Sequence, residues 1–138
     1  MGLNVTRREQ DGILILQLKG RLTFGAADLI LNDEIHHALL WRTTRLVIDL
    51  AGIEKMDSAG LGTLLYARTE LSKTGGGLAL SDLNRTQMEA LLVARLETVF
   101  NVYATEQDAI NSFFPERKVP HYDLLAAVTS MRQDRVRT

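Results

Sequence analysis

RLVIDLAGIEKMDSAGLGTLL, residues 45–65, contains the end of one element and the start of another. Its first part, Leu46–Leu50, is a short and nearly continuous run of branched apolar residues, which is typical of a strand buried on both faces. A connector, Ala51–Met56, follows, and after it apolar residues recur three and four positions apart, as on one face of a helix. The stretch therefore predicts a central strand, a loop and a helix that begins within one residue of Ser58.

The predicted helix start carries the residues that cap helices. A side-chain oxygen of Asp57 or Ser58 can accept a hydrogen bond from an amide that has no partner inside the helix. The Ser58 hydroxyl would then lie at the positive end of the helix dipole, with Gly60 and Gly62 leaving room for a phosphate on it. A second interpretation stays open, in which Asp57 and Ser58 only cap the helix and the glycines only allow close packing.

Length and composition exclude several classes of protein. The 138 residues suffice for one domain with its own core. The absence of cysteine excludes disulfides, a thiol nucleophile and a Cys-ligated metal, and we expect neither a metal nor a cofactor. With 16 basic and 17 acidic residues the chain has no overall field to attract nucleic acid or anionic lipid, and no apolar run reaches the roughly 18 residues of a membrane span. We expect a cytoplasmic protein without nucleic acid binding or membrane insertion.

The segments before residue 45 indicate a hairpin and a helix. Asp11-Gly12 separates two strand-like runs, Leu3–Gln10 and Ile13–Lys19, and this dipeptide is the strongest short-range hairpin signal. A glycine-bracketed bend follows at residues 20–25, before a helical stretch. Its expected apolar face consists of Ala27, Ile30, Leu31, Ile35, Ala38 and Leu39, with His36 and His37 at its rim.

The segments after residue 65 are defined by caps and stops. In chain order we predict a glycine stop at 73–77, a strand at 78–80, a helix capped by Asn84 and Gln87, a strand at 99–103, and a helix that starts at Thr105 and ends at Pro115. Strands that alternate with helices pair mainly in parallel. The fold class is therefore α/β, a mixed, mainly parallel five-stranded sheet with about four helices, in a domain of residues 1–115.

Residues 116–138 form a C-terminal extension with a different pattern. Pro120 fits the first turn of an amphipathic helix whose apolar stripe is Tyr122, Leu125, Val128 and Met131. Such a stripe must be covered, either by the domain itself or by a second copy in a homodimer. We expect residues 132–138 to be a frayed tail.

The segment Met56–Gly62, directly after the buried strand, resembles the STAS domain family, the anti-sigma factor antagonists. The order of elements from Leu3 to Phe114 agrees with that fold, as do Gly20-Arg21-Leu22 after the second strand and Leu83-Asn84 before the third helix. The resemblance implies that Ser58 is phosphorylated by an anti-sigma factor serine kinase and dephosphorylated by a phosphatase. Unphosphorylated, such a domain would hold the anti-sigma factor and free a sigma factor, in bacterial regulation of transcription.

On this interpretation a partner-binding face surrounds Ser58. Its expected members are Thr23, Phe24, Asp57, Ser58, Ala59, Gly60 and Leu61. One alternative is a STAS subunit of a scaffold or ABC-type transporter complex without regulated phosphorylation. A remote alternative is a serine hydrolase, although Met56 stands where the G-x-S-x-G pattern requires glycine and no histidine is convincingly placed as a base.

Overall fold

Strands and helices alternate along the chain in the computed structural model, which describes residues 2–137 and the side chains of residues 2–131. In chain order the elements are β1 (Leu3–Gln10), β2 (Ile13–Leu22), α1 (Ala26–Leu40), β3 (Arg45–Met56), α2 (Ser58–Lys73), β4 (Gly77–Ser81), α3 (Arg85–Val93), β5 (Asn101–Tyr103), α4 (Glu106–Asn111) and α5 (Leu124–Arg137). This order confirms the predicted alternation and the additional C-terminal helix.

The strands form one five-stranded sheet in the order β1-β2-β3-β4-β5. β1 pairs antiparallel with β2, and the other three pairings are parallel. The predicted hairpin turn is confirmed, because Asp11 and Gly12 both have positive φ, 55° and 78°. The mixed, mainly parallel α/β sheet is therefore the observed fold.

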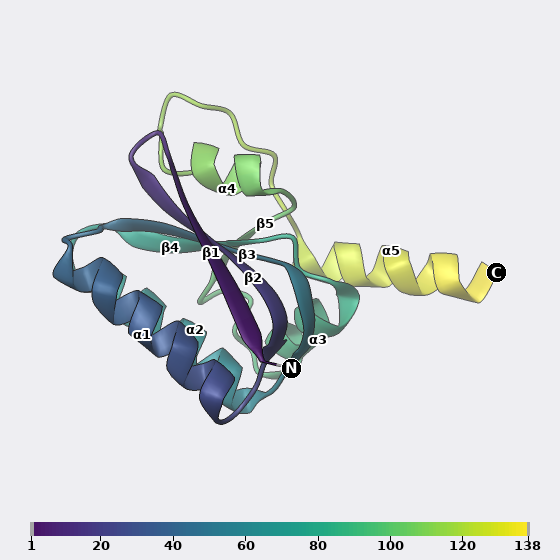
Figure 1. The fold of residues 1–138 in the computed structure, drawn as a ribbon. Coiled ribbons are helices and arrows are strands. Elements are labelled where there is room, and N and C mark those ends of the chain that lie inside the picture. The colour runs from purple at the N-terminus through teal and green to yellow at the C-terminus, as the bar shows by residue number, and fades with distance from the viewer. Residues whose placement is uncertain (1, 138) are drawn as a thin grey trace.

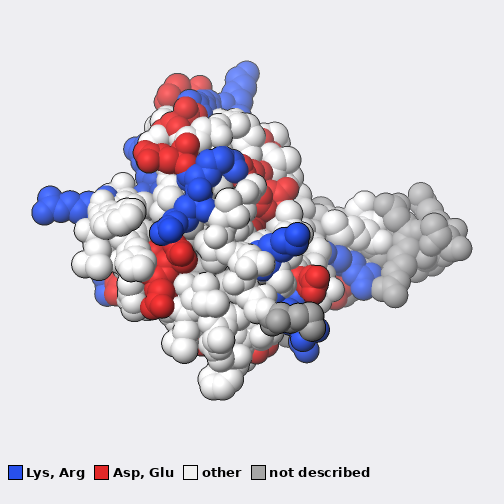
Figure 2. Space-filling model, viewed as in Figure 1, with Lys and Arg blue, Asp and Glu red and all other residues white. Residues whose placement is uncertain are grey.

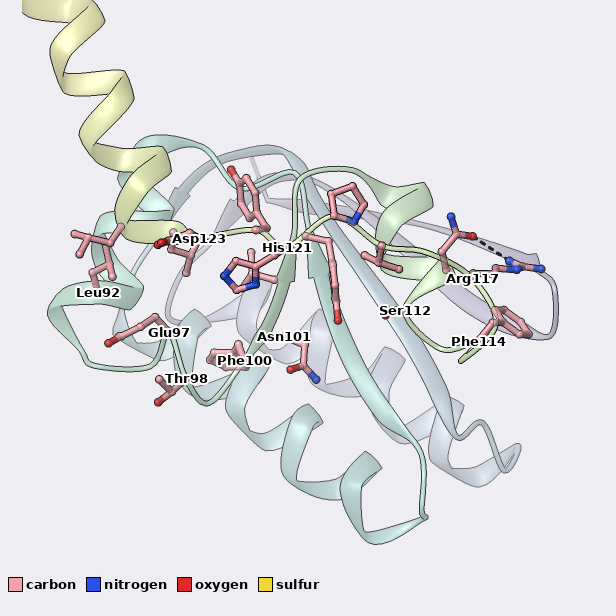
Figure 3. A pocket seen from close by; sticks show the side chains of 18 of the residues that line it. Leu92, Glu97, Thr98, Phe100, Asn101, Ser112, Phe114, Arg117, His121 and Asp123 are labelled. Carbon is pink, nitrogen blue, oxygen red and sulfur yellow. Dashed lines mark hydrogen bonds between the residues drawn. The ribbon is translucent and has the colours of Figure 1, made fainter.

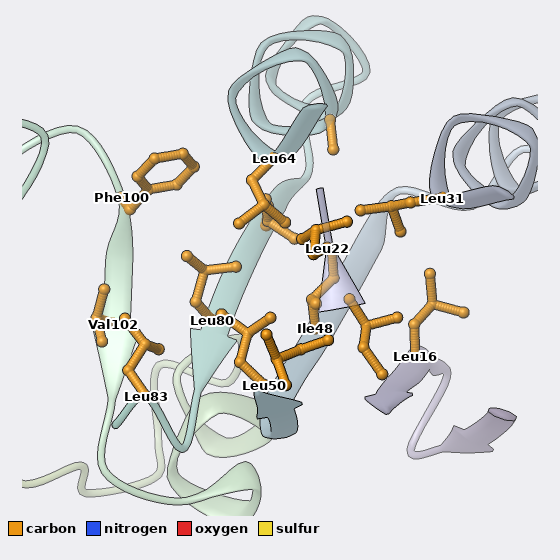
Figure 4. Close-up of a cluster of buried hydrophobic side chains, with 14 of the residues drawn as sticks. Leu16, Leu22, Leu31, Ile48, Leu50, Leu64, Leu80, Leu83, Phe100 and Val102 are labelled. Atoms are coloured by element: carbon orange, nitrogen blue, oxygen red, sulfur yellow. The ribbon is translucent and has the colours of Figure 1, made fainter. Parts of the chain in front are cut away.

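The helices cover the sheet unequally. α1 and α2 lie side by side on one face, and α4 lies on the opposite face (Figure 1). The larger core fills the space between the sheet, α1, α2 and α3. Leu16, Ile48 and Leu80 lie in a row on the neighbouring strands β2, β3 and β4, and Leu64 of α2 packs over the sheet (Figure 4). A smaller cluster under α4 consists of Ile13, Ile15, Val47, Ala79, Ala109 and Ile110. The central strand predicted from Leu46–Leu50 is thus buried on both faces.

β3 is longer than predicted. The segment expected as a connector, Ala51–Met56, continues the strand, because β2 also extends to Leu22 and the Cα pairing of the two strands reaches Leu22 and Met56. The register between β2 and β3 shifts twice, between Gln17 and Lys19 and between Gly20 and Arg21, and each shift leaves one extra residue in β3. Ile53, which lies between the two shifts, is only 2% exposed. Two charged residues and a glycine suggested a loop, although Ile53 still faces the core.

The predicted caps are confirmed. The Asn84 side chain accepts a hydrogen bond from the Gln87 amide at 2.8 Å, and the Gln87 side chain accepts one from the Asn84 amide at 3.0 Å. Thr105 Oγ1 accepts from the Asp108 amide at 3.1 Å at the start of α4. Each cap satisfies amides that would otherwise lack a partner at the helix start.

Three details differ from the sequence prediction. In α1, Ile30 is 37% exposed rather than part of the buried face. β5 starts at Asn101 rather than residue 99. α4 ends at Asn111, four residues before Pro115, and the half-buried Phe113 and Phe114 follow in turns, so contact with the smaller cluster continues after the helix has ended.

The C-terminal extension packs on the domain near α3, while the rest of α5 projects away from it (Figure 1). α5 starts at Leu124 rather than at Pro120, after Asp123, whose Oδ1 accepts from the Ala126 amide at 3.2 Å. Leu124 and Val128 are buried in the larger core, whereas Leu125, which we expected to be covered, is 64% exposed. Docking on the domain is therefore the observed outcome, and a homodimer stays a prediction. The backbone of α5 is helical to Arg137, and Thr138 lies outside the described residues.

Candidate functional site

Ser58 is the first residue of α2 and is exposed. It follows the carboxyl end of β3 by two residues, at the edge of the sheet where parallel strands end and ligands usually bind in α/β folds. The helix dipole is positive at this end, so the environment of the hydroxyl favours negative charge. The predicted helix start and the exposure of its serine are both observed.

Asp57 holds two segments together at this position. Its Oδ1 accepts from the Gly60 amide at 3.0 Å and caps α2, while its Oδ2 accepts from the Phe24 amide at 2.9 Å. The Phe24 amide, followed by the Gly60 amide, lowers the pKa of Asp57, because both hydrogen bonds favour the ionised carboxylate. The carboxylate therefore stays ionised near pH 7 and joins the loop between β2 and α1 to the start of α2.

Gly60 has the place that the second interpretation of the sequence predicts, in close packing. It is buried, and a Cβ at this position would lie 2.3 Å from the carbonyl oxygen of Leu22. Gly60 therefore lets α2 approach the end of β2 and does not belong to an exposed binding face. Gly62 is exposed, and a Cβ added to it would have no neighbour within 4 Å.

The other predicted members of the face lie together around the carboxylate. Phe24 is 82% exposed, although large aromatic side chains are usually covered. Thr23, Ala59 and Leu61 are half-buried beside it in the two segments that Asp57 joins. We call residues 23, 24, 57–59 and 61 the Ser58 surface. It combines an exposed aromatic ring, a hydroxyl and an ionised carboxylate.

A second link between α1 and α2 was not predicted. Thr63 Oγ1 donates to Asp28 Oδ1, and the same hydroxyl lies 3.2 Å from the carbonyl oxygen of Ala59. Asp28 stands in the first turn of α1, where an acidic residue is expected as a dipole partner, so no local pattern indicated that it pairs with α2. This contact fixes the start of α1 relative to the Ser58 surface.

The histidines do not form a catalytic arrangement with Ser58. His36 lies on α1 with its Nε2 3.0 Å from the hydroxyl of Tyr66. His121 lies in the C-terminal extension and lines a groove beside β5. Among the described residues no histidine is hydrogen-bonded to Ser58, which argues against the hydrolase alternative.

The face of the molecule drawn in Figure 2 shows no large area of one charge. Lysine, arginine, aspartate and glutamate alternate over the face drawn in Figure 2. Within residues 2–137, no helix combines the length and apolar character needed to cross a bilayer.

Comparison with known proteins identifies the family. The family model of the STAS domain matches residues 4–109. An anti-sigma F factor antagonist of Paenibacillus polymyxa is 27% identical over 111 residues, which cover 80% of this chain and 94% of that protein. The chain therefore belongs to the STAS domain family.

Solved structures share the fold at lower identity. A putative anti-sigma factor antagonist of Thermotoga maritima has a TM-score of 0.74 and 22% identity, covering 79% of this chain and 93% of that one. The anti-sigma factor antagonist SpoIIAA in its unphosphorylated form has a TM-score of 0.63 and 21% identity, covering 79% and 96%. The murine anion transporter Slc26a9 gives a TM-score of 0.63 at 20% identity, with 75% of this chain matching 18% of the transporter.

Proposed function

We propose that this STAS domain is an anti-sigma factor antagonist whose binding to an anti-sigma factor is switched by phosphorylation of Ser58. The observation that carries the proposal is the exposed hydroxyl on the first residue of α2, beside the exposed ring of Phe24. The similarity to an anti-sigma F factor antagonist supports the partner class.

Phosphorylation at this position changes charge without threatening the fold. A phosphoserine carries about −1.5 to −2 charges. At a helix N-terminus it is stabilising by roughly 0.3–1 kcal/mol, which the ionised Asp57 next to it partly offsets. Because Ser58 is exposed and outside both core clusters, the added group displaces no packed side chain.

The effect of the phosphate therefore falls on the partner interface. Enclosing a dianion beside the Asp57 carboxylate, without a cation from the partner, costs several kcal/mol. Each 1.4 kcal/mol lowers affinity about tenfold. The unphosphorylated domain would bind the anti-sigma factor in the cytoplasm, that kinase would phosphorylate Ser58, and a phosphatase would restore binding.

The site of phosphorylation is testable with purified proteins. We expect incubation with the cognate anti-sigma factor kinase and ATP to place one phosphate on Ser58, located by tandem mass spectrometry. Ser58→Ala should abolish labelling. Ser72→Ala is the matched control, because Ser72 is also exposed and lies near the other end of α2. Phosphate elsewhere, or equal labelling of Ser58→Ala, would remove the proposal.

The switch itself is testable by calorimetry. We expect Ser58→Ala to bind the anti-sigma factor about as tightly as the wild type, and the phosphorylated protein to bind at least tenfold more weakly. Equal affinities of the phosphorylated and unphosphorylated forms for the anti-sigma factor would show that phosphorylation does not switch the binding.

A second candidate function is a STAS subunit of a transporter or scaffold complex, which the similarity to Slc26a9 favours. In that role the Ser58 surface would bind an ATPase or another subunit without regulated phosphorylation. Affinity purification of the tagged protein from its native cell distinguishes the two: an anti-sigma factor in the eluate supports the first function, and transporter subunits support the second.

A further inference from the structure

A groove of about 760 Å³ lies on the opposite side of β5 from β4, between this strand and the chain segment that leads to α5. Figure 3 shows Phe100 and Asn101 facing this space beside His121 of the extension. The volume falls in the range of ligand sites, roughly 300–1,000 Å³. The wall formed by residues 115–125 lies outside the STAS match, which ends at residue 109. The groove is therefore built jointly by the family domain and the extension.

The backbone of β5 is unpaired on the side of the groove. β5 is the last strand of the sheet. The carbonyl of Tyr103 accepts from the Asp82 amide at 3.3 Å and so faces β4. Because backbone groups alternate along a strand, the amide and carbonyl of Val102 face the groove. In the described part of the chain no backbone hydrogen bond joins residues 118–122 to β5, so the extension does not act as a sixth strand.

The two ends of the groove differ in charge. Arg117 lies at one end and is already neutralised: its Nη1 is 3.1 Å from Asp11 Oδ2, and its guanidinium stacks on Phe114 at 4.0 Å from the ring centroid. Glu97 and Asp123 both line the other end of the groove, with their carboxylates apart from each other (Figure 3). Neither takes part in an ion pair among the described residues. That end therefore offers negative charge to a ligand.

We propose that this groove binds an extended peptide segment of a partner protein, which adds a strand to β5 and places a lysine or arginine at the acidic end that Glu97 and Asp123 line. A strand edge is recognised by a second backbone with alternating donors and acceptors, and side-chain pockets supply the specificity. The aromatic residues that line the groove, Phe100, Tyr103, Phe114 and Tyr122, cover the peptide side chains. The site is separate from the Ser58 surface and does not depend on phosphorylation.

The probe is a phage-displayed library of random heptapeptides, selected against the full-length protein. Enriched sequences are synthesised with a fluorophore and titrated by fluorescence anisotropy. We expect saturable binding, with a lysine or arginine at one fixed position of the enriched sequences. In nuclear magnetic resonance spectra the peptide should shift the Val102 amide and slow its hydrogen exchange.

Matched variants identify the acidic end. The double substitution Glu97→Gln and Asp123→Asn removes two charges, while asparagine keeps the cap of α5. We expect the double variant to bind the cationic peptide with roughly fivefold lower affinity than the wild type. A version of that peptide with norleucine in place of the lysine or arginine should bind both proteins with the same affinity. The control Glu54→Gln removes an exposed charge outside the groove and should have no effect.

Three results would overturn the inference: no peptide that saturates, amide shifts confined to regions outside residues 97–103 and 115–125, or equal binding by the double variant and the wild type. Ser58→Ala should bind the selected peptides like the wild type. The test is thus separate from that of the Ser58 switch, and failure of either leaves the other standing.

Discussion

The substitution Gly60→Ala tests whether the start of α2 is held against the end of β2 by the absence of a side chain. A Cβ at Gly60 would lie 2.3 Å from the carbonyl oxygen of Leu22 and 2.8 Å from its Cγ. The oxygen cannot rotate away, because it belongs to a strand and also accepts from the Asp57 amide at 3.3 Å. The helix start must therefore move outward, together with the cap and Ser58.

The expected cost follows from two opposing contributions. Overpacking of a core contact typically costs about 1–3 kcal/mol, and a clash with backbone belongs at the upper end. Alanine in a helix gains about 1 kcal/mol over glycine. We expect Gly60→Ala to lower the free energy of unfolding by about 1–2 kcal/mol, or Tm by roughly 4–8 °C for a chain of this length.

Gly62→Ala is the internal control, two residues further along the same helix. Nothing lies within 4 Å of a Cβ built at Gly62, so only the gain in helix propensity remains. We expect this variant to be more stable than the wild type by about 0.4–1 kcal/mol. Urea unfolding of the three proteins at pH 7, followed by circular dichroism, gives the midpoints and m-values.

The reasoning is refuted if Gly60→Ala unfolds at the same or a higher urea concentration than Gly62→Ala with unchanged m-values. That result would mean that α2 does not approach Leu22 as closely as the structure shows. A loss of stability with unchanged binding of the anti-sigma factor would instead separate the packing role of Gly60 from the proposed function.

Three further predictions concern single residues. The pKa of Asp57 is lower in the folded protein than in the unfolded chain, where it is near 4, so the ionised carboxylate stabilises the fold above that pH. This stability is lost as the pH falls through the folded pKa. We therefore expect the free energy of unfolding of Asp57→Asn to fall less than that of the wild type between pH 5 and about pH 2.5, as measured by urea titration. Arg42 and Arg95 have φ of 60° and 58° after α1 and α3, so Arg42→Gly and Arg95→Gly should each raise the free energy of unfolding by about 0.5–1 kcal/mol and so raise the urea midpoint; a lower midpoint would contradict this. Phe24→Ser should change stability by less than about 0.5 kcal/mol in thermal unfolding yet weaken binding of the anti-sigma factor in calorimetry, and unaltered binding would remove Phe24 from the interface.

Local signals with a stereochemical cause predicted the fold well. The hairpin at Asp11-Gly12 and the helix start after Asp57 were predictable because each requires a particular residue type at one position. The capping box of Asn84 and Gln87 was readable for the same reason. The family resemblance and the capping pattern both indicated Ser58 at the start of this helix.

The errors occur where packing at long range overrides local pattern. Ala51–Met56 reads as a loop, yet β2 supplies a partner strand along its whole length. The predicted stripe of α5 was right at Val128 but wrong at Leu125, because Leu124 is buried in its place where α5 contacts α3. Sequence pattern identifies an amphipathic helix but cannot fix its rotation against an unknown neighbour.

The candidate surfaces could be read from the sequence only where one segment of chain carries most of their residues. The Ser58 surface has its core in one stretch of chain, and Phe24 was added by resemblance. For Gly60 the sequence left open both a place beside the phosphate and a packing role, because the choice depends on the position of Leu22 in another element. The groove beside β5 is formed by several segments between residue 92 and residue 125, so no local motif predicted it.

The Asp57 carboxylate accepts hydrogen bonds from the Phe24 and Gly60 amides, and this bears on how a kinase would recognise the protein as its substrate. An enzyme that phosphorylates Ser58, as we propose, would meet a preformed, three-dimensional epitope rather than a linear consensus motif. A synthetic peptide copying residues 54–64 lacks the loop that supplies Phe24 and is too short to hold a helix in water, so it should be a poor kinase substrate. Newly made chains would then acquire the phosphate only after they have folded, which makes the modification a mark of mature protein.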